Sequence, residues 1–319
     1  MQSQPAPSSS RDPRALAAGL YEAVVSTVRG KPDEVRLALV ALFSGGHLLV
    51  EDVPGTGKTL LAKALASAIG GRFRRVQCTP DLLPADVTGT DVYGPATGAW
   101  EFRPGPVFAN VLLVDEVNRA SPRTQAALLE PMEERQVTVD GTTHLLPEPF
   151  FVVATQNPVG AAGTFPLPES QLDRFAIALT LGLPGRDAER EILAGRGGVD
   201  ALDAIEPVTT PDALAAAITS TRHVHCAASV IDYVLDVAGA TREHPDVVIG
   251  ASPRASLGLL HAAQAYATVV GRDFVSPDDV KAVAPHAMAH RLVLSSGTDV
   301  PHAARIMRDI IAAIAAPRP

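Results

Sequence analysis

Hydrophobic positions are distributed in two different ways along this chain of 319 residues. Up to about residue 181, short apolar runs recur, and glycine, proline or acidic residues follow them. The runs lie at 47–51, 74–78, 111–114, 150–154 and 175–181. Most of them are apolar throughout instead of alternating with polar residues, which is typical of strands buried on both faces. The pattern therefore predicts a parallel sheet covered by helices.

Helical patterns fill most of the remaining sequence. We expect helices at 13–28, 33–43, 60–68 and 125–134, and then at 187–194, 213–221, 227–241, 253–270, 277–288 and 301–315. Asp33 is a candidate cap for the second helix, and Ser276 with Asp279 forms a capped start for the helix at 277.

The strand pattern stops near residues 183–184. We therefore predict a disordered tail over residues 1–13, an α/β domain over residues 14–184, and an all-helical domain over residues 185–319. Two hairpins are expected within the first domain. One surrounds residues 95–98, and the other joins strands 136–139 and 142–145 through Asp140-Gly141, a strong hairpin signal.

Composition excludes several classes of protein. The net charge is −8 and the pI is near 5.6, so a broadly cationic, nucleic-acid-binding surface is not expected. The two cysteines are far apart in sequence and have no metal-ligand spacing. The sequence contains no apolar run of roughly 18 residues, the length needed to cross a membrane. We expect a cytoplasmic protein.

The segment 51–60, EDVPGTGKTL, is a candidate phosphate-binding loop. The general pattern G-x-x-x-x-G-K-[ST] requires a glycine where this chain has Asp52. Gly55 and Gly57 permit the tight backbone path, Lys58 supplies positive charge, and Thr59 supplies a hydroxyl for Mg²⁺. A chance match is the alternative. If the loop is genuine, Asp52→Gly leaves ATP binding intact and Lys58→Ala abolishes it.

Two further polar positions follow apolar strands. Asp115 and Glu116 end the run at 111–114, where one carboxylate can hold Mg²⁺ through water and the other can polarise an attacking water. Asn157 follows the run at 150–154 and can hold that water against the terminal phosphate. The alternatives are an ordinary acidic strand end and a turn-forming Asn-Pro pair.

Five segments in this order, DVPGTGKT, LLVDEVNRA, VVATQNP, FPLPESQLDRF and GASPRA, resemble the MoxR family of AAA+ ATPases. The resemblance extends over nearly the whole chain from about residue 20. In this family the first position of the phosphate loop is often not glycine. The resemblance implies an AAA+ phosphate-loop core with a parallel sheet, followed by an all-helical lid.

The resemblance also implies roles for individual residues. Asn157 matches sensor 1, Arg174 an arginine finger that reaches a neighbouring subunit, and Arg254 sensor 2 on the lid. Glu116, Asn157, Arg174 and Arg254 form the catalytic set, and Thr59 and Asp115 the Mg²⁺ set. The ATP-binding set is Val28, Gly30, Pro54, Gly55, Thr56, Gly57, Lys58, Thr59 and Leu60. Residues 86–102 resemble the helix-2 insert, and Asp140-Gly141 the hairpin before sensor 1.

Both arginines also have simpler interpretations. Arg174 can form a local salt bridge with Asp173 or Glu169. Arg254 can be a surface charge, although the positive end of a helix dipole makes a helix start unfavourable for a cation. In the functional interpretation, we expect ATP in the crevice between the two domains, at the carboxyl ends of the strands.

The function implied by the resemblance is an ATP-hydrolysing, chaperone-like remodeller that matures protein complexes. It implies a homo-oligomeric ring, with a hexamer expected, and a client that carries a von Willebrand factor A domain. Two other functions remain open, namely a DNA-directed AAA+ motor or helicase-loader relative, and a nucleotide-dependent scaffold without turnover. The acidic charge and the hairpin tip at 139–142, which lacks Lys and Arg, count against DNA.

Overall fold

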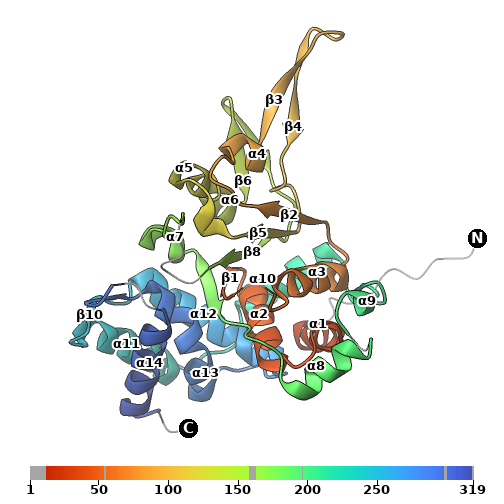
Figure 1. Cartoon of the computed structure of the whole chain (residues 1–319). Helices are drawn as coiled ribbons and strands as arrows, with labels where there is room; N and C mark the ends of the chain where they lie inside the picture. Colours follow the sequence, from red (N-terminus) through yellow and green to blue (C-terminus); the bar gives the residue numbers. More distant parts are fainter. Residues whose placement is uncertain (1–11, 54, 158–162, 196, 298–299, 318–319) are drawn as a thin grey trace, which may run out of the picture.

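A five-stranded parallel sheet forms the centre of the molecule (Figure 1). The computed structural model describes residues 12–53, 55–157, 163–195, 197–297 and 300–317. The strands are β1 (His47–Glu51), β2 (Phe73–Gln77), β5 (Val111–Asp115), β8 (Phe151–Gln156) and β9 (Phe175–Leu179), in the order β2-β5-β8-β1-β9. Every pairing in this sheet is parallel, which confirms the arrangement predicted from the apolar runs.

Successive residues of each strand enter different apolar clusters, because side chains alternate between the faces of a sheet. Leu48 and Val50 of β1 join one cluster, and Leu49 joins the other. The first cluster contains the buried faces of α1 (Pro13–Thr27), α2 (Pro32–Phe43) and α3 (Lys58–Ile69). The second contains residues of α4 (Pro84–Thr88), η1 (Val117–Arg119), α6 (Leu129–Glu134) and α7 (Glu169–Leu172), and α5 (Pro122–Ala126) precedes α6 in the chain.

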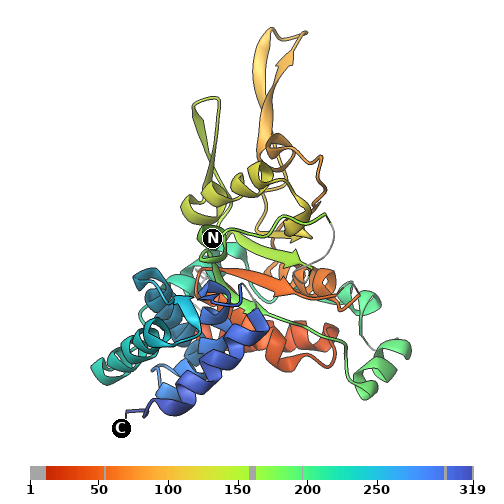
Figure 2. The ribbon, with the colours of Figure 1, turned by 60° about the vertical axis from the view of Figure 1, so that its left-hand side comes forward.

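Two antiparallel hairpins project from the same end of the molecule in both ribbon views (Figure 1, Figure 2). The longer one pairs β3 (Gly89–Gly94) with β4 (Ala99–Pro104), and the other pairs β6 (Gln136–Val139) with β7 (Thr142–Leu145). Asp140 and Gly141 both have positive φ, at 47° and 82°. Two consecutive positive φ angles are those of a type I′ turn, so the Asp-Gly pair forms the turn that the sequence predicts.

The C-terminal part is helical apart from one short ladder. Its helices are α8 (Arg186–Leu193), α9 (Val199–Leu202), α10 (Pro211–Thr221), α11 (Ala228–Glu243), α12 (Pro253–Val269), α13 (Pro277–Met288), η2 (Ala289–Arg291) and α14 (Val300–Ala313). The ladder, which the sequence analysis missed, pairs β10 (Val247–Ile249) with β11 (Val293–Leu294).

The lid shares an apolar core with the α1–α3 layer. Leu259 of α12 and Met288 of α13 belong to the same cluster as Leu39 of α2. α12 packs on α2, and α13 packs on β9, the edge strand of the sheet. Backbone groups of β9 also contact the lid, since the carbonyl of Phe175 lies 2.9 Å from His290 Nε2. The lid therefore covers one edge of the sheet.

Two local expectations need correction. The helix expected at 125–134 is two helices, α5 and α6, because the ring of Pro131 is incompatible with a helical carbonyl four residues earlier. α2 begins at Pro32, and Lys31 occupies its cap position, so Asp33 lies in the first turn. α1 begins at Pro13, as predicted, and Asp12 caps it. Residues 1–11 of the expected tail lie outside the described residues.

Within the described ranges, no helix is long and apolar enough to cross a membrane.

Two buried histidines link the fold to pH. His47 and His290 are each 1% exposed. Burial, reinforced by the charge of Arg291, lowers the pKa of His290 to about 3. Burial and then the charge of Arg135 hold the pKa of His47 well below its usual value. Both side chains are therefore neutral in the folded protein, whereas an unfolded histidine takes up a proton near pH 6.5.

We predict that the free energy of unfolding falls as the pH drops below about 6.5, by up to about 1.4 kcal/mol per pH unit and per buried histidine. The folded pKa values are depressed, so this stability is present above the unfolded pKa and is lost towards the folded one. Urea unfolding at pH 7.5, 6.0 and 5.0 measures the slope. His290→Asn, which keeps a donor but cannot titrate, should have a shallower slope. Equal slopes for both proteins would contradict this explanation.

Candidate nucleotide site

The segment between β1 and α3 has the backbone of a phosphate cradle. Gly55 and Gly57 have φ angles of 88° and 95°, which glycine adopts readily. A Cβ atom built on either glycine would have no other atom within 4 Å, so the protein leaves open space at both positions. Pro54 lies outside the described residues. The loop leads directly into the N-terminus of α3, whose first N–H groups favour anions.

Lys58 is the first residue of α3 and is largely buried. Its ammonium group donates hydrogen bonds to the carbonyls of Asp52, at 2.9 Å, and Val53, at 2.8 Å. Thr59 and Leu60 follow in the first helical turn and are partly exposed, and Thr56 is buried within the loop. The lysine is thus folded back over the loop, next to the space in which outer phosphates would lie.

The acidic pair at the end of β5 is fixed by two neighbouring strands. Asp115 Oδ1 accepts a hydrogen bond from the Thr155 hydroxyl at 2.7 Å, and Thr155 accepts one from the Glu116 N–H at 2.8 Å. Asp115 Oδ2 forms an ion pair with Arg75 of β2 at 2.7 Å. Neither Thr155 nor Arg75 is among the site residues predicted from the sequence. Thr155 is a polar residue near the end of β8, a position that could have signalled it, whereas Arg75 lies in the middle of β2 and has no such signal.

Glu116 has an unusual backbone for a non-glycine residue, with φ at 55°. Residues held in this region carry a conformational cost and cluster at functional sites. Its carboxylate forms an ion pair with Arg119 at 3.0 Å. Arg119 therefore contacts the carboxylate that the sequence assigns to polarising water.

Asn157 lies beside the acidic pair, where parallel strands end together. Its carbonyl accepts a hydrogen bond from the side-chain amide of Asn118 at 3.1 Å. Its N–H donates to Asn118 Oδ1 at 3.4 Å. Asn118 lies within η1 and connects the loop after β5 to the loop after β8.

The metal assignment is consistent with the chemistry of Mg²⁺, which prefers oxygen ligands and usually takes one or two from protein and the rest from phosphates and water. Thr59 and Asp115 offer a hydroxyl and a carboxylate. Among the described residues, no group of three or more His, Cys, Asp or Glu side chains is arranged to hold a metal alone. A site shared with a nucleotide therefore suits this chain better than an all-protein metal cage.

Asp52, the residue that departs from the general loop pattern, has structural partners. It is 5% exposed. Its carboxylate accepts hydrogen bonds from the N–H groups of Val53, at 2.7 Å, and Gly182, at 2.6 Å. Gly182 belongs to the segment that leads from β9 to α8. The Lys31 ammonium binds the carbonyls on either side, those of Leu181 and Leu183. Asp52 and Lys31 together clamp this segment onto the phosphate loop.

The segment expected to pack on adenine lies against the start of the lid. Val28 is 4% exposed and belongs to the main core. Gly30 has φ at 74°, and a Cβ built on it would lie only 2.5 Å from Ala188 Cβ of α8. Gly30 is therefore required by a close approach of α8. A direct contact of Val28 or Gly30 with adenine remains a prediction.

Arg174 and Arg254 lie near the amino ends of the strands, whereas Lys58, Asp115 and Asn157 lie near the carboxyl ends. Arg174 precedes Phe175, which pairs with His47 at the amino end of β1, whereas Lys58 follows the carboxyl end of β1. A strand of this length spans roughly 16 Å at about 3.3 Å per residue. Arg174 therefore cannot contact a nucleotide held by Lys58 of its own chain.

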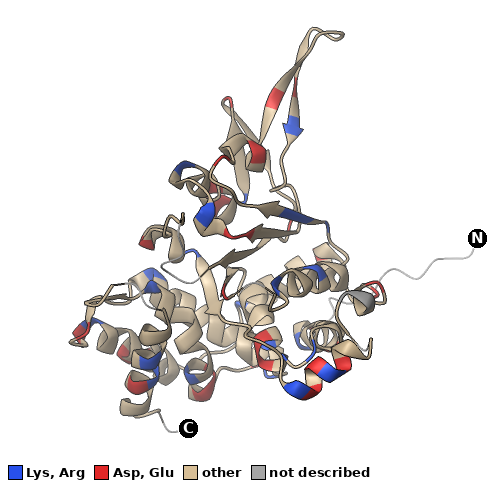
Figure 3. Ribbon diagram, viewed as in Figure 1, with Lys and Arg blue, Asp and Glu red and all other residues tan. Residues whose placement is uncertain are grey.

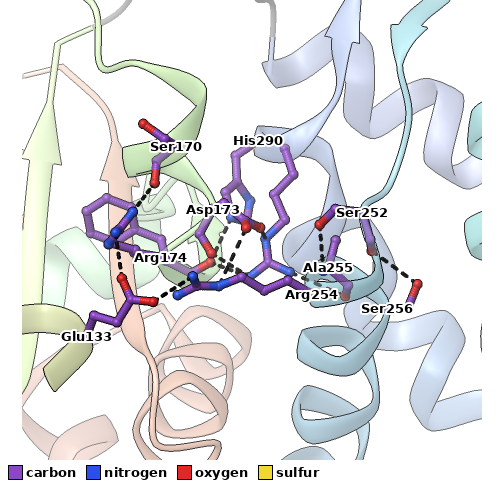
Figure 4. A network of polar contacts seen from close by, with 11 residues as sticks. Glu133, Ser170, Asp173, Arg174, Ser252, Arg254, Ala255, Ser256 and His290 are labelled. Carbon is purple, nitrogen blue, oxygen red and sulfur yellow. Dashed lines mark hydrogen bonds and ion pairs between the residues drawn. The ribbon is translucent and has the colours of Figure 1, made fainter. Parts of the chain in front are cut away.

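A network of charges joins the two arginines to each other (Figure 4). Glu133 binds Arg174 at 2.5 Å and Arg254 at 2.9 Å. Asp173 lies 3.5 Å from Arg254 and 3.3 Å from Arg291 of the lid. Burial opposes the charged form of Glu133, but Arg254 and Arg174 outweigh it and lower the pKa of this carboxyl.

These contacts bear on the simpler interpretations of both arginines. Arg174 is salt-bridged within the chain, but its carboxylate partner is Glu133 and not Asp173 or Glu169. Arg254 forms ion pairs with Glu133 and Asp173, and its assignment as sensor 2 remains a prediction. The interpretation of Arg254 as a simple surface charge at the start of α12 is incomplete, because two carboxylates bind it.

Charge on the projecting hairpins is sparse and mixed in sign (Figure 3). Arg103 is the only Lys or Arg in β3 and β4, where Asp91 and Glu101 oppose it, and β6 and β7 have neither Lys nor Arg. Phosphate backbones attract cationic surfaces, so these hairpins give no support to a DNA-directed function.

We predict that Asp52→Gly weakens binding of an ATP analogue by about tenfold, in contrast to the expectation from sequence alone. The change removes two hydrogen bonds to a charged group, worth about 1.5–3 kcal/mol each, and loosens the loop. A titration with a fluorescent analogue measures affinity. Hydrogen exchange measures whether residues 181–183 lose protection.

Lys31→Met is the companion variant, because it releases the same segment without altering the phosphate loop. It should accelerate exchange at residues 181–183 and weaken nucleotide binding less than Asp52→Gly does. Unchanged affinity and unchanged exchange in Asp52→Gly would show that the clamp has no part in binding.

Comparison with known proteins supports the same interpretation. A model of the ATPase family associated with various cellular activities (AAA) matches residues 47–177, and a model of the AAA lid domain matches residues 239–310. The crystal structure of a proposed ATPase from Cytophaga hutchinsonii superposes with a TM-score of 0.86 at 34% identity, covering 97% of both chains.

Curated relatives align over most of their length. Chaperone MoxR1 of Mycobacterium tuberculosis is 44% identical over 290 residues, covering 88% of this chain and 76% of that protein. The uncharacterized protein YeaC of Bacillus subtilis is 46% identical over 290 residues, covering 90% and 91%. Protein MoxR of Paracoccus denitrificans is 33% identical over 299 residues, covering 86% and 87%. With its parallel core and its helical lid, the chain belongs to the MoxR family of AAA+ ATPases.

Proposed function

We propose that this protein hydrolyses ATP at the contact between two subunits of a homo-oligomeric ring, for which a hexamer is the expected size. The observation that carries the proposal is the separation of the polar groups. Lys58 and Glu116 lie at the carboxyl edge of the sheet, and Arg174 lies at the amino edge with Arg254 beside it. Each subunit then offers half of a catalytic site on each of two faces.

At the carboxyl edge, the chain supplies binding and water activation. Residues 55–60 would surround the phosphates with backbone N–H groups, and Lys58 would leave the carbonyls of Asp52 and Val53 to bind the outer phosphates. Thr59 and Asp115 would hold Mg²⁺, which neutralises charge on the phosphates when bound. The adenine would lie near Val28 and Gly30.

Glu116 would orient and polarise the attacking water, with Asn157 holding it in line with the terminal phosphate. The ion pair of Glu116 with Arg119 has to open for this, because a carboxylate held by a guanidinium is a weaker acceptor. The positive φ of Glu116 fixes where its side chain leaves the strand.

At the amino edge, Arg174 and Arg254 would complete the site of the adjacent subunit. Guanidinium donors stabilise the charge that develops on a transferring phosphoryl group, and removing an arginine finger costs about 10³–10⁵ in turnover. Because the lid carries Arg254, the position of the lid on the core would affect hydrolysis in the adjacent subunit. Hydrolysis would in turn alter how subunits fit together, and the ring would pass this motion to a client.

The client is proposed to be a protein complex under assembly, with a von Willebrand factor A domain in the partner. One relative is named a chaperone, which supports the general class of action. The projecting hairpins are a suitable contact surface, because Tyr93 and Trp100 are exposed on the longer one. The proposal places the protein in the cytoplasm, in contact with ATP.

We predict that Glu116→Gln stops ATP turnover while ATP remains bound, because the amide cannot polarise water and the phosphate loop is untouched. Turnover is measured by phosphate release, and retention of nucleotide by filtration of the assembled protein. Undiminished hydrolysis in this variant would rule out Glu116 as the water-activating residue.

A mixing experiment tests whether the site is shared. Lys58→Ala lacks nucleotide binding but has intact arginines, and Arg174→Ala has the opposite defect. Each variant alone should be nearly inactive, and an equimolar mixture should regain part of the wild-type rate. If mixtures stay as inactive as the separate variants while still assembling, the arginines do not act across subunits.

A further inference from the structure

Glu133 contacts the guanidinium groups of Arg174 and Arg254 at the same time. Its Oε2 atom lies 2.5 Å from Arg174 Nη2, and its Oε1 atom lies 2.9 Å from Arg254 Nη1. Glu133 is the fifth residue of α6, on the core, and none of the sequence motifs includes it. Figure 4 shows the carboxylate between the two arginines, which come from different parts of the chain.

The two arginines need a carboxylate in order to stay together. Arg174 belongs to the core and Arg254 to the first turn of α12 on the lid, where the helix dipole disfavours a cation. Two guanidinium groups near each other also repel. A single carboxylate that binds both, one oxygen each, offsets this repulsion and fixes the distance between them. Of these two arginines, it is Arg254 that Asp173 also contacts, at the longer distance of 3.5 Å.

The pair remains accessible from outside. The side chain of Arg254 is 49% exposed, that of Glu133 is 40% exposed, and that of Arg174 is 17% exposed. All three line a cavity of about 430 Å³ between core and lid. Arg174 also donates to the Ser170 carbonyl, so its guanidinium is held from two sides.

Arg291 joins the lid to the core close to the pair of arginines. Its guanidinium donates to the carbonyls of Asp173, at 3.2 Å, and Phe175, at 3.0 Å, both on the core. Gly258 of α12 leaves room for it, since a Cβ there would lie 2.6 Å from Arg291 Nη1. Burial lowers the pKa of Arg291 to about 10, which still leaves it charged at neutral pH. The lid therefore brings Arg254 to Glu133 in a defined position.

We propose that Glu133 is a positioning residue, which joins Arg174 and Arg254 into one unit across the boundary between core and lid. The unit forms only when the lid is docked, so lid docking becomes a condition for catalysis in the adjacent subunit. This inference rests on the proposed function, in which both arginines act on a neighbour's nucleotide.

The test is the steady-state ATPase rate of Glu133→Gln under conditions where the ring forms. Glutamine has no charge, and its amide hydrogens repel one of the two guanidiniums. We expect kcat to fall between about ten- and a hundredfold, as for other misplaced catalytic groups, while KM for ATP stays within about twofold. Glu134 lies on the same helix, but it accepts a hydrogen bond from Gln136 and does not bind the arginines. Glu134→Gln is therefore the matched control and should keep the wild-type rate.

A double variant tests whether Glu133 acts through the arginine. With Arg254→Ala as the background, adding Glu133→Gln should lower kcat by much less than it does in the wild type, because coupled residues are not additive. Independent, multiplicative losses would overturn the inference. A higher rate in Glu133→Gln than in the wild type would also overturn it, since Glu133 would then be masking the arginines.

Mixed rings separate this inference from the proposed function. Glu133→Gln mixed with Lys58→Ala should regain activity, because the second variant offers an intact pair of arginines to the first. Glu133→Gln mixed with Arg174→Ala should not, since neither offers one. A wild-type rate for Glu133→Gln overturns the inference alone. Failure of Lys58→Ala to complement Arg174→Ala overturns the proposed function, and this inference with it.

Discussion

The parallel direction of five strands is the constraint on which the rest of this structure depends. All carboxyl ends meet at one edge of the sheet, so Lys58, Asp115 and Asn157 come together there although they lie far apart in sequence. The same rule sends Arg174 to the opposite edge, because it precedes its strand. Under the proposed function, one subunit therefore carries both kinds of catalytic group and cannot use them on the same nucleotide. The proposal accordingly requires assembly of subunits.

Buried or half-buried carboxylates connect both ends of the strands, the carboxyl ends and the amino ends, to the lid. Asp52 ties the phosphate loop to Gly182, in the segment that leads to α8. Glu133 ties Arg174 of the core to Arg254 of the lid. The lid itself shares one apolar core with the α1–α3 layer, so it is a packed part of the subunit rather than a loose cover. The nucleotide site and the arginine pair are thus both connected to the lid or to the segment that leads to it.

Much of this could be predicted from sequence, because strands, hairpin turns and the phosphate loop are encoded by neighbouring residues. The hairpin at Asp140-Gly141 agrees residue for residue. The sequence did not reveal partners that come together only in the fold, such as Thr155 with Asp115 or Glu133 with both arginines. Asp52 is instructive, since its departure from the loop pattern marks a contact 130 residues away and not merely a tolerated change.

The central claim is that each catalytic site is completed by a second subunit. The most direct measurement is the ATPase rate per subunit of the wild-type protein over a wide range of protein concentration, with the assembly state followed by light scattering in the same samples. The account predicts that the rate per subunit rises steeply as the ring forms and is close to zero for the monomer. A rate per subunit that is constant down to concentrations where only monomers exist would contradict it.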